Sequence, residues 1–311
     1  MTIVTRRARL DDVAAITEVH CSNVREWLRF PPKGKPVPAC REELSLYQLC
    51  RNGGPWMSVE TCAIHLNRLL LAGHYPLVAE LDGQVLGEAE LFLSEEPPPL
   101  GRYLSLSVLY VHRAHHGRGL GSALMRAALD LAAELECDAL TVYPEASAFY
   151  ARFGLKPFVT CMEVTVLCQP ERMTYRSEAL EYGDYKLVAG LAMPIGRYVS
   201  ACQEWERERP LNQLAFEEEK GIQRVPLRLE TDSQVLYVVF TGEPPSAAVR
   251  AWTAGDVSER TILLLQDQGH RLGFERLELF MEEGEARRLL GEKAVRESSS
   301  RMEMWLKRVK S

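Results

Sequence analysis

Residues 103–135 constrain this chain most, because a strand, a glycine-rich turn and a helix follow one another there. The stretch 103–111 alternates apolar and small polar residues and ends in bulky ones, which predicts a β-strand. Glycines follow at Gly117, Gly119 and Gly121. A helix with one buried face is predicted next, because apolar residues recur at steps of three and four, at Leu124, Ala128, Leu131 and Leu135. The glycines therefore lie at a strand-to-helix turn.

A glycine turn at the start of a helix is suited to binding an anion. The first backbone N–H groups of a helix have no partner within it and carry roughly half a positive charge, so a phosphate or pyrophosphate can approach them where side chains are absent. A tight turn without a ligand is the alternative, because short motifs have many false positives. Two known phosphate loops are excluded: the turn contains no Gly-Lys-Ser/Thr, and its Gly-x-Gly-x-Gly spacing is not that of dinucleotide sites.

A second strand, predicted at 139–143, and a short helix, predicted at 146–154, come after the first helix. This order resembles the GNAT superfamily of acetyl-CoA-dependent N-acetyltransferases, whose signature is Arg/Gln-x-x-Gly-x-Gly/Ala at the turn and a Phe-Tyr-x-x-x-Gly-Phe-type helix further along. Here the first motif reads His116-Gly117-Arg118-Gly119-Leu120-Gly121 and the second reads Phe149-Tyr150-Ala151-Arg152-Phe153-Gly154-Leu155. His116 stands where the family usually has Arg or Gln, and this departure could loosen pyrophosphate binding.

The resemblance implies an α/β fold with a mixed sheet flanked by helices, acetyl-CoA as co-substrate and no metal. It also implies which residues contact the cofactor, on the strand end, the loop and the first helical turn: Leu109, Tyr110, Val111, His116, Gly117, Arg118, Gly119, Leu120, Gly121 and Ser122. A backbone N–H of the strand end would polarise the thioester carbonyl. Tyr150 would protonate the departing thiolate, as the family implies, and simple packing of its ring against the sheet is the alternative.

A predicted β-hairpin at 77–92, with an Asp-Gly turn at 82–83, supplies candidates for the general base. Strict alternation would place Leu86, Glu88, Glu90 and Phe92 on one face, and Val85, Gly87, Ala89 and Leu91 on the other. Glu88 and Glu90 therefore share a face of a strand that we expect beside the cofactor, so either can remove the proton of an attacking amine. A solvated sheet face carrying both carboxylates is the alternative.

The chain repeats itself, which indicates two copies of one fold. When the two halves are aligned at an offset of 137 residues (291 − 154), several identical residues match without a gap: Asp130 with Asp267, Leu135 with Leu272, Leu140 with Leu277, Gly154 with Gly291 and Lys156 with Lys293. The polar stretch 169–173 marks the boundary. We therefore predict a catalytic domain at residues 1–169 and a second, GNAT-like domain at residues 174–311.

The second copy is expected to have lost its site. Residues 253–258 replace the three-glycine loop and place the Asp256 carboxylate where a pyrophosphate would need to lie, and like charges repel. Arg287 stands where the first copy has Tyr150. We therefore expect a degenerate domain that packs on the first copy and shapes its acceptor cleft.

Composition excludes several other classes of protein. The 311 residues are enough for two domains. A formal net charge of −6 and a pI near 5.8 argue against nucleic acid as the main partner and favour a cationic substrate. Eight cysteines show no Cys-x-x-Cys pair, so we expect reduced, mostly buried thiols in a cytoplasmic protein. No signal core or membrane-length apolar stretch is found, so no membrane partner is expected.

Two side-chain groups remain open. The loop histidines His112, His115 and His116 lack a carboxylate at useful spacing, so we expect surface or phosphate-side groups rather than a metal site. Nearby arginines, Arg113, Arg118 and Arg126, are candidates for contacts with the cofactor's phosphates. Four aromatic residues of the variable stretch after the first helix, Trp27, Phe30, Tyr47 and Trp56, either line an acceptor pocket or, as we favour, mostly belong to the core.

The sequence thus predicts transfer of an acetyl group from acetyl-CoA to a primary amine of a small molecule or peptide by direct attack. A non-catalytic acyl-CoA-binding sensor or interaction protein is the second hypothesis, supported by His116 and the silent second copy. A structural tandem with no cofactor is the third, which the intact glycine loop disfavours. The acceptor, the acyl chain length and the oligomeric state do not follow from the sequence.

Overall fold

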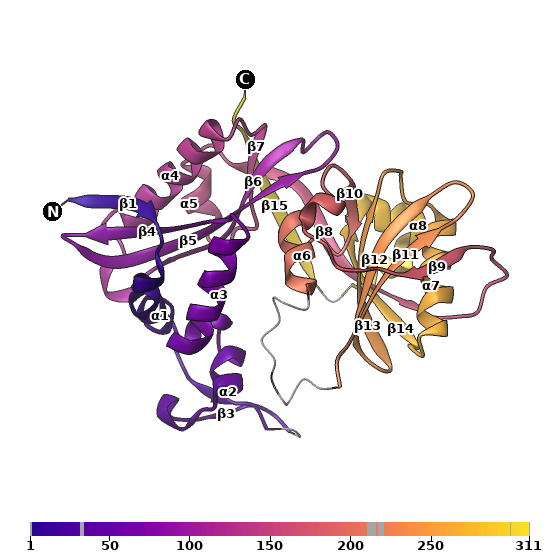
Figure 1. The fold of residues 1–311 in the computed structure, drawn as a ribbon, viewed down its shortest axis with the longest axis horizontal. Coiled ribbons are helices and arrows are strands. Elements are labelled where there is room, and N and C mark those ends of the chain that lie inside the picture. Colours follow the sequence, from indigo (N-terminus) through magenta and orange to yellow (C-terminus); the bar gives the residue numbers. More distant parts are fainter. Residues whose placement is uncertain (1, 32–33, 210–215, 217–220, 299, 311) are drawn as a thin grey trace. The chain divides into compact units, whose positions relative to one another are not determined.

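The computed structural model describes residues 2–31, 34–209, 216, 221–298 and 300–310, which form two compact units (Figure 1). Unit 1 consists of residues 1–92, 106–135 and 214–218, and unit 2 of residues 93–105, 136–213 and 219–311. Each unit contains strands of a mixed sheet with helices packed on it, so the α/β class expected from the sequence is confirmed.

Unit 1 is built on the strand order β1-β4-β5-β6, in which β1 and β5 both pair antiparallel with β4. Its strands are β1 (Ile3–Arg7), β4 (Tyr75–Leu81), β5 (Gln84–Glu95) and β6 (Arg102–Val111), and the last residues of β5 and the first of β6 are counted with unit 2. A small hairpin joins β2 (Leu28–Arg29) to β3 (Val37–Pro38). Its helices are α1 (Val13–Cys21), α2 (Leu46–Arg51), α3 (Val59–Leu71) and α4 (Leu120–Glu134).

The predicted hairpin is present, but its alternation is broken. Asp82 and Gly83 both have positive φ, 51° and 84°, as a two-residue hairpin turn of this kind requires. The register between β4 and β5 then slips by one residue: Glu80 lies opposite Val85, whereas Ala79 lies opposite Gly87. This bulge puts Val85 on the same face as Glu88, so the prediction that they face opposite ways is wrong.

The two faces of β5 are covered by different helices, with α4 on one side of β1, β4 and β5 and helices α1 and α3 on the other (Figure 1). Gly87 faces α4, where a Cβ would come within 3.2 Å of the Leu124 side chain. Opposite, α1 and α3 pack through Ile16, Cys62 and Leu66 onto Val78. Glu88 and Glu90 lie on this second face, beneath α1 and α3.

Unit 2 has the strand order β7-β15-β8-β14-β10-β13-β12-β11-β9. The strands are β7 (Ala139–Val142), β8 (Lys156–Leu167), β9 (Arg176–Ala179), β10 (Ala192–Ile195), β11 (Gln223–Glu230), β12 (Val235–Glu243), β13 (Ser246–Thr253), β14 (Arg276–Glu282) and β15 (Arg301–Arg308). The helices are α5 (Ser147–Ala151), α6 (Ala201–Glu208), α7 (Glu259–Arg271) and α8 (Glu283–Arg296).

Alternation along β12 and β13 separates two cores in unit 2. Val238 and Val249 face the cluster that contains Leu264 and Leu265 of α7. Val239 and Trp252 face the opposite cluster, and other members of that cluster lie on α6. The sheet therefore has a helical layer on each face, as period-two strands between amphipathic helices produce.

Two strands of unit 2 make long-range pairings that the repeat did not predict. The C-terminal strand β15 lies between β7 and β8 and pairs antiparallel with both. Strand β10 pairs with both β13 and β14, and Ile195 lies opposite Ala251 and Met281. The two compact units are defined by contacts in space, whereas the repeat is a pattern along the sequence. The units therefore do not test the predicted domain boundary at 169–174, which stays a prediction.

All eight cysteines are free in the structure, and five of them are buried, as expected. Among the described residues no helix is both long and apolar enough to cross a membrane. The cytoplasmic location stays a prediction.

Candidate active site

Glu88 and Glu90 are the centre of a buried polar cluster in unit 1. Glu88 is 1% exposed and Glu90 2%. The alternative of a solvated sheet face is therefore wrong, because helices α1 and α3 cover these side chains. Three residues complete the cluster: His20 from α1, His65 from α3 and Trp56 from the turn before α3.

The cluster is organised as two hydrogen-bonded groups. Nε2 of His20 lies 2.7 Å from Oε2 of Glu88. Oε1 of Glu90 is 2.8 Å from Nε1 of Trp56, which donates to it, and 2.8 Å from Nε2 of His65. Buried carboxylates need such partners, because an unpaired one would be strongly disfavoured by desolvation.

Aromatic stacking fixes the His20 ring between two neighbours. Its centroid is 4.8 Å from that of Trp56, with the planes nearly parallel at 7°, and 4.6 Å from the ring of Tyr110. Tyr110 is 38% exposed and belongs to the end of β6. The buried His20–Glu88 pair thus lies next to a partly exposed residue that is predicted to contact the cofactor.

The two carboxyl groups have opposite pKa shifts. Burial and the neighbouring charge of Glu90 raise the pKa of Glu88 well above its ordinary value. Although burial opposes it, the charge and hydrogen bond of His65, together with the Trp56 donor, lower the pKa of Glu90. Burial lowers the pKa of His20 to about 4. The cluster therefore places a neutral imidazole beside one carboxyl group with a raised pKa and one with a lowered pKa.

The predicted glycine loop lies at the start of α4 with backbone N–H groups available. Gly117 and Gly119 have φ of 76° and 92°, the left-handed region that glycine adopts without strain. A Cβ at Gly117 would meet no atom within 4 Å, so the space above it is open. Within the described residues, no hydrogen bond satisfies the backbone N–H groups of 117–122, and the first bond of the helix is Ala123 N–H to the Gly119 carbonyl. The residues present fit a diphosphate.

His116 has a role that the sequence did not reveal. Its Nε2 lies 2.9 Å from the Val111 carbonyl, which also accepts a hydrogen bond from Asn23 of 3.0 Å. The imidazole therefore ties the loop to the end of β6. An Arg or Gln at this position is not required to hold the loop in its left-handed turns.

Cationic side chains surround the loop. Arg113, Arg118 and Arg126 are exposed and form no ion pair within the described part of the chain. They add positive charge next to the helix start without being tied to carboxylates. Of the other predicted contact residues, Leu109 is half-buried and Leu120 is buried under the loop.

The remaining candidates have the following positions. Tyr150 lies on α5, in unit 2, with its ring edge against Phe149 at 5.0 Å. The His112 and His115 rings pack against each other at 5.3 Å. No group of three or more His, Cys, Asp or Glu side chains among the described residues could hold a metal ion. The four aromatic residues Trp27, Phe30, Tyr47 and Trp56 are half-buried, and Trp56 packs against the core cluster beneath α1 and α3, so their assignment to the core stays a prediction.

Residues 39–155 match the acetyltransferase (GNAT) family, and the match contains the Glu88–Glu90 strand, the glycine loop and Tyr150. This segment of the chain is a GNAT acetyltransferase domain. No curated protein matches the chain.

Several solved structures share the fold of nearly the whole chain. A GCN5-related N-acetyltransferase from Anabaena variabilis has 13% identity and a TM-score of 0.67, over 99% of this chain and 73% of that one. A second, from Kribbella flavida, has 13% identity and a TM-score of 0.57, over 99% and 72%. Eis1 from Mycobacterium abscessus has 14% identity and a TM-score of 0.55, over 99% and 74%. At these identities the likeness shows the fold alone.

Sequence reasoning missed His20 and His65 as members of the site. Both lie on helical faces that pack on the sheet, and His65 follows buried Thr61 at a spacing of four. The usable signal was a histidine on each of two core-facing helices opposite a strand with two glutamates. Each feature alone is also typical of an ordinary core, so only their meeting in space identifies the cluster.

Proposed function

We propose that the GNAT domain transfers an acetyl group from acetyl-CoA to a primary amine of a small molecule or peptide. The observation that carries this proposal is the row of unpartnered N–H groups at 117–122 on an open glycine turn. Four features support it together: the family match, the free arginines, the acid–base cluster and the strand end at Leu109, Tyr110 and Val111.

Of the two candidate bases, the geometry favours Glu88. A general base works best when its pKa is near the working pH, and burial moves the pKa of Glu88 upward in that direction. Glu90 is held by Trp56 and His65 as an ionised group, so it is a weak proton acceptor. We assign Glu90 to keeping a negative charge beside Glu88.

Removal of the amine proton uses Glu88 and His20, which contact each other. The attacking amine must be neutral, and Glu88 takes its proton, directly or through a water. Neutral His20 bonds to Glu88 and holds that carboxyl next to the Tyr110 ring. A backbone N–H of the strand end polarises the thioester carbonyl, and Tyr150 protonates the departing thiolate.

We further propose that the chain is a tandem of two GNAT-like folds whose second copy, at 174–311, is degenerate. Elements follow in the same order in both halves: hairpin β4–β5 matches β11–β12, helix α4 matches α7, and β7 matches β14. In the second half Asp256 occupies the loop before α7 and Arg287 replaces the tyrosine. Strand β10 fills the space between β13 and β14 with the chain's own backbone.

An acyl-CoA-binding protein without turnover is the second candidate function. The observation in its favour is the nearly complete burial of Glu88 and His20, since a base must reach its substrate. A cytoplasmic location, oligomer formation and the absence of nucleic-acid and membrane partners remain predictions.

The proposal is tested with Gly117→Ala and a matched control, Gly73→Ala. Gly73, at the end of α3, has φ of 79° and open space around it, so alanine costs about 1–2 kcal/mol of backbone strain at either position. We expect similar losses of thermal stability, but weaker acetyl-CoA binding by calorimetry for Gly117→Ala only. Equal affinities of both variants, or no binding by the unmodified protein, would overturn the proposal.

Turnover separates the two candidate functions. Release of the CoA thiol, measured with a panel of primary amines, should depend on the amine if the domain is an enzyme. Tyr150→Phe should then lower turnover while leaving acetyl-CoA affinity about the same. Binding without amine-dependent thiol release would favour the sensor, and unchanged turnover in Tyr150→Phe would remove the acid role.

A further inference from the structure

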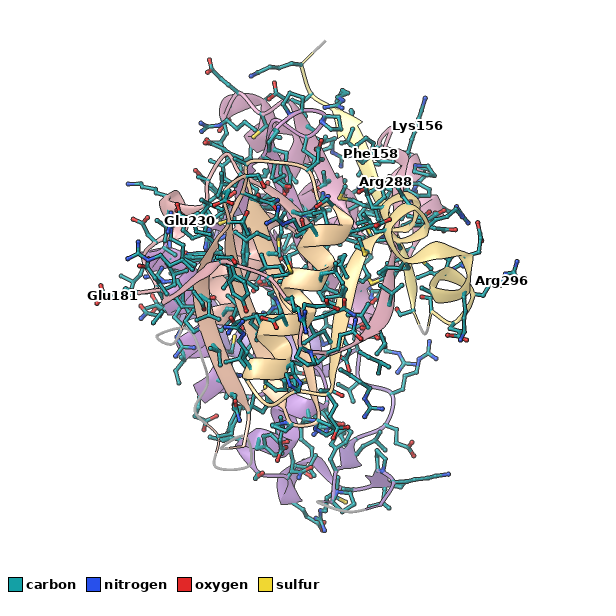
Figure 2. The ribbon with its side chains drawn as sticks, turned by 90° about the vertical axis from the view of Figure 1, so that its right-hand side faces the viewer. Lys156, Phe158, Glu181, Glu230, Arg288 and Arg296 are labelled. Atoms are coloured by element: carbon teal, nitrogen blue, oxygen red, sulfur yellow. The ribbon has the colours of Figure 1, made fainter. Side chains whose placement is uncertain are left out.

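Unit 2 contains a cavity of about 820 Å³ that none of the proposed chemistry uses. Its volume is within the range of small-molecule pockets. All of its lining residues belong to unit 2, and they come from the segment 96–100, from β8, from the β10 region, from the loop 255–258, from the end of β14 and from α8. Figure 2 labels two of them, Phe158 and Arg288.

Arg197 is the cation of this cavity whose donors are least used. Its side chain is only 17% exposed, and Nε has no hydrogen-bond partner among the described residues. The nearest carboxylate oxygen, Oε1 of Glu96, lies 3.8 Å from Nε, and Nη1 reaches only the weakly accepting sulfur of Met304, also at 3.8 Å. A guanidinium has five N–H donors, so most of its hydrogen-bonding capacity remains available.

Glu96 is held away from Arg197 by two other donors. The Tyr103 hydroxyl donates to Oε1 of Glu96 at 2.5 Å, and the backbone N–H of Met193 donates to Oε2 at 3.0 Å. Glu96 therefore offsets the charge of Arg197 without forming hydrogen bonds to the N–H donors of its guanidinium. The Tyr143 hydroxyl in turn donates to the Arg197 carbonyl at 3.1 Å and fixes the backbone.

The rest of the lining selects the kind of anion. The lining includes apolar side chains, Leu100, Phe158 and Phe280 among them. It also has acidic groups besides Glu96: Asp256 and Glu282 have no ion pair in the described structure, and Glu285 is already paired with Arg288. These carboxylates would repel a multiply charged phosphate more strongly than a single carboxylate on an apolar body.

We propose that this cavity binds a small monocarboxylate with an apolar body, whose carboxylate pairs with the Arg197 guanidinium. The planar fork matches a carboxylate bidentately, which a lysine cannot reproduce. The site is separate from the glycine loop of unit 1 and does not depend on the activity proposed there.

The probe is 4-phenylbutyrate, titrated into the full chain by calorimetry, with 4-phenylbutan-1-amine and inorganic pyrophosphate as charge controls. We expect binding of the acid alone, weakened about tenfold or more in Arg197→Lys, which keeps the charge but loses the fork. Arg288 lines the same cavity, but its guanidinium is engaged with Glu285 and the Val257 carbonyl. The control variant Arg288→Met should therefore change the affinity for the acid less than threefold, which corresponds to about 0.6 kcal/mol or less.

Folding is controlled with the double variant Arg197→Met/Glu96→Gln, which removes both charges together. It should not bind the acid and should keep the acetyl-CoA affinity of the unmodified chain. Equal binding of the acid by this variant, equal binding of the amine or the pyrophosphate, or no heat with the unmodified protein would each overturn the proposal.

Discussion

Replacing Glu90 by glutamine should lower the pKa of Glu88. The two residues are two apart on β5, where their Cα atoms are about 6.6 Å apart at the usual strand rise of about 3.3 Å per residue. At an effective dielectric constant of about 20, two unit charges at that distance repel by about 2.5 kcal/mol. Removing the charge of Glu90 therefore takes away one of the causes that raise the pKa of Glu88.

The substitution removes the charge of Glu90 and keeps the length of its side chain. A glutamine oxygen can still accept from Trp56 and His65, so the cluster keeps its two donors. We would follow the carboxyl resonance of Glu88 by carbon NMR in protein with labelled glutamate, assigned by its loss in Glu88→Gln. The rising limb of kcat/KM against pH should move to lower pH by the same amount.

Glu80→Gln is the matched control, because Glu80 lies on the same sheet but pairs with Arg6 near the surface. It should leave the pKa of Glu88 in place. A pKa of Glu88 that stays unchanged in Glu90→Gln, or that rises, would refute the view that the charge of Glu90 raises the pKa of Glu88. A shift of the same size in Glu80→Gln would show that the effect is not local.

Two further perturbations have signs fixed by the structure. Burial lowers the pKa of His20 from 6.5 to about 4, so only the unfolded chain takes up the imidazole proton as the pH falls through this window. The free energy of unfolding should therefore fall by about 3 kcal/mol more in the unmodified protein than in His20→Gln. Urea unfolding at both ends of the window measures the difference. Arg250→Met leaves Glu204 and Glu208 buried without their 2.9 Å partner and should cost about 3–5 kcal/mol. Arg228→Met, at a half-exposed pair, should change the free energy of unfolding far less in the same denaturation assay.

Local patterns predicted the frame of the site well. The strand 103–111, the glycine turn and the following helix appear as β6, the loop and α4, because each is specified by periodicity over neighbouring residues. The face of Val85 was wrong, since a one-residue bulge leaves no mark in an alternating sequence.

Contacts between distant segments could not be read from the sequence. His20 and Glu88 are 68 residues apart, and their hydrogen bond depends on how α1 packs on β5. The four-residue strand β10 is too short for any periodic signal, and its two partners come later in the chain. For the same reason the sequence does not identify Arg197 as a binding residue, because its available donors depend on Glu96 being held by Tyr103.

The proposed silence of the second copy has a cause in its sheet as well as in its loop. Strands β13 and β14 pair in parallel over 246–249 and 276–279, and beyond that point both pair with β10 instead. Strand β13 leads to the loop that contains Asp256, as β6 leads to the glycine loop. A covalently attached strand is always present at high effective concentration, so a soluble ligand cannot displace it easily. Removing the Asp256 carboxylate alone would relieve the repulsion and leave β10 in place, and the two obstacles are therefore independent.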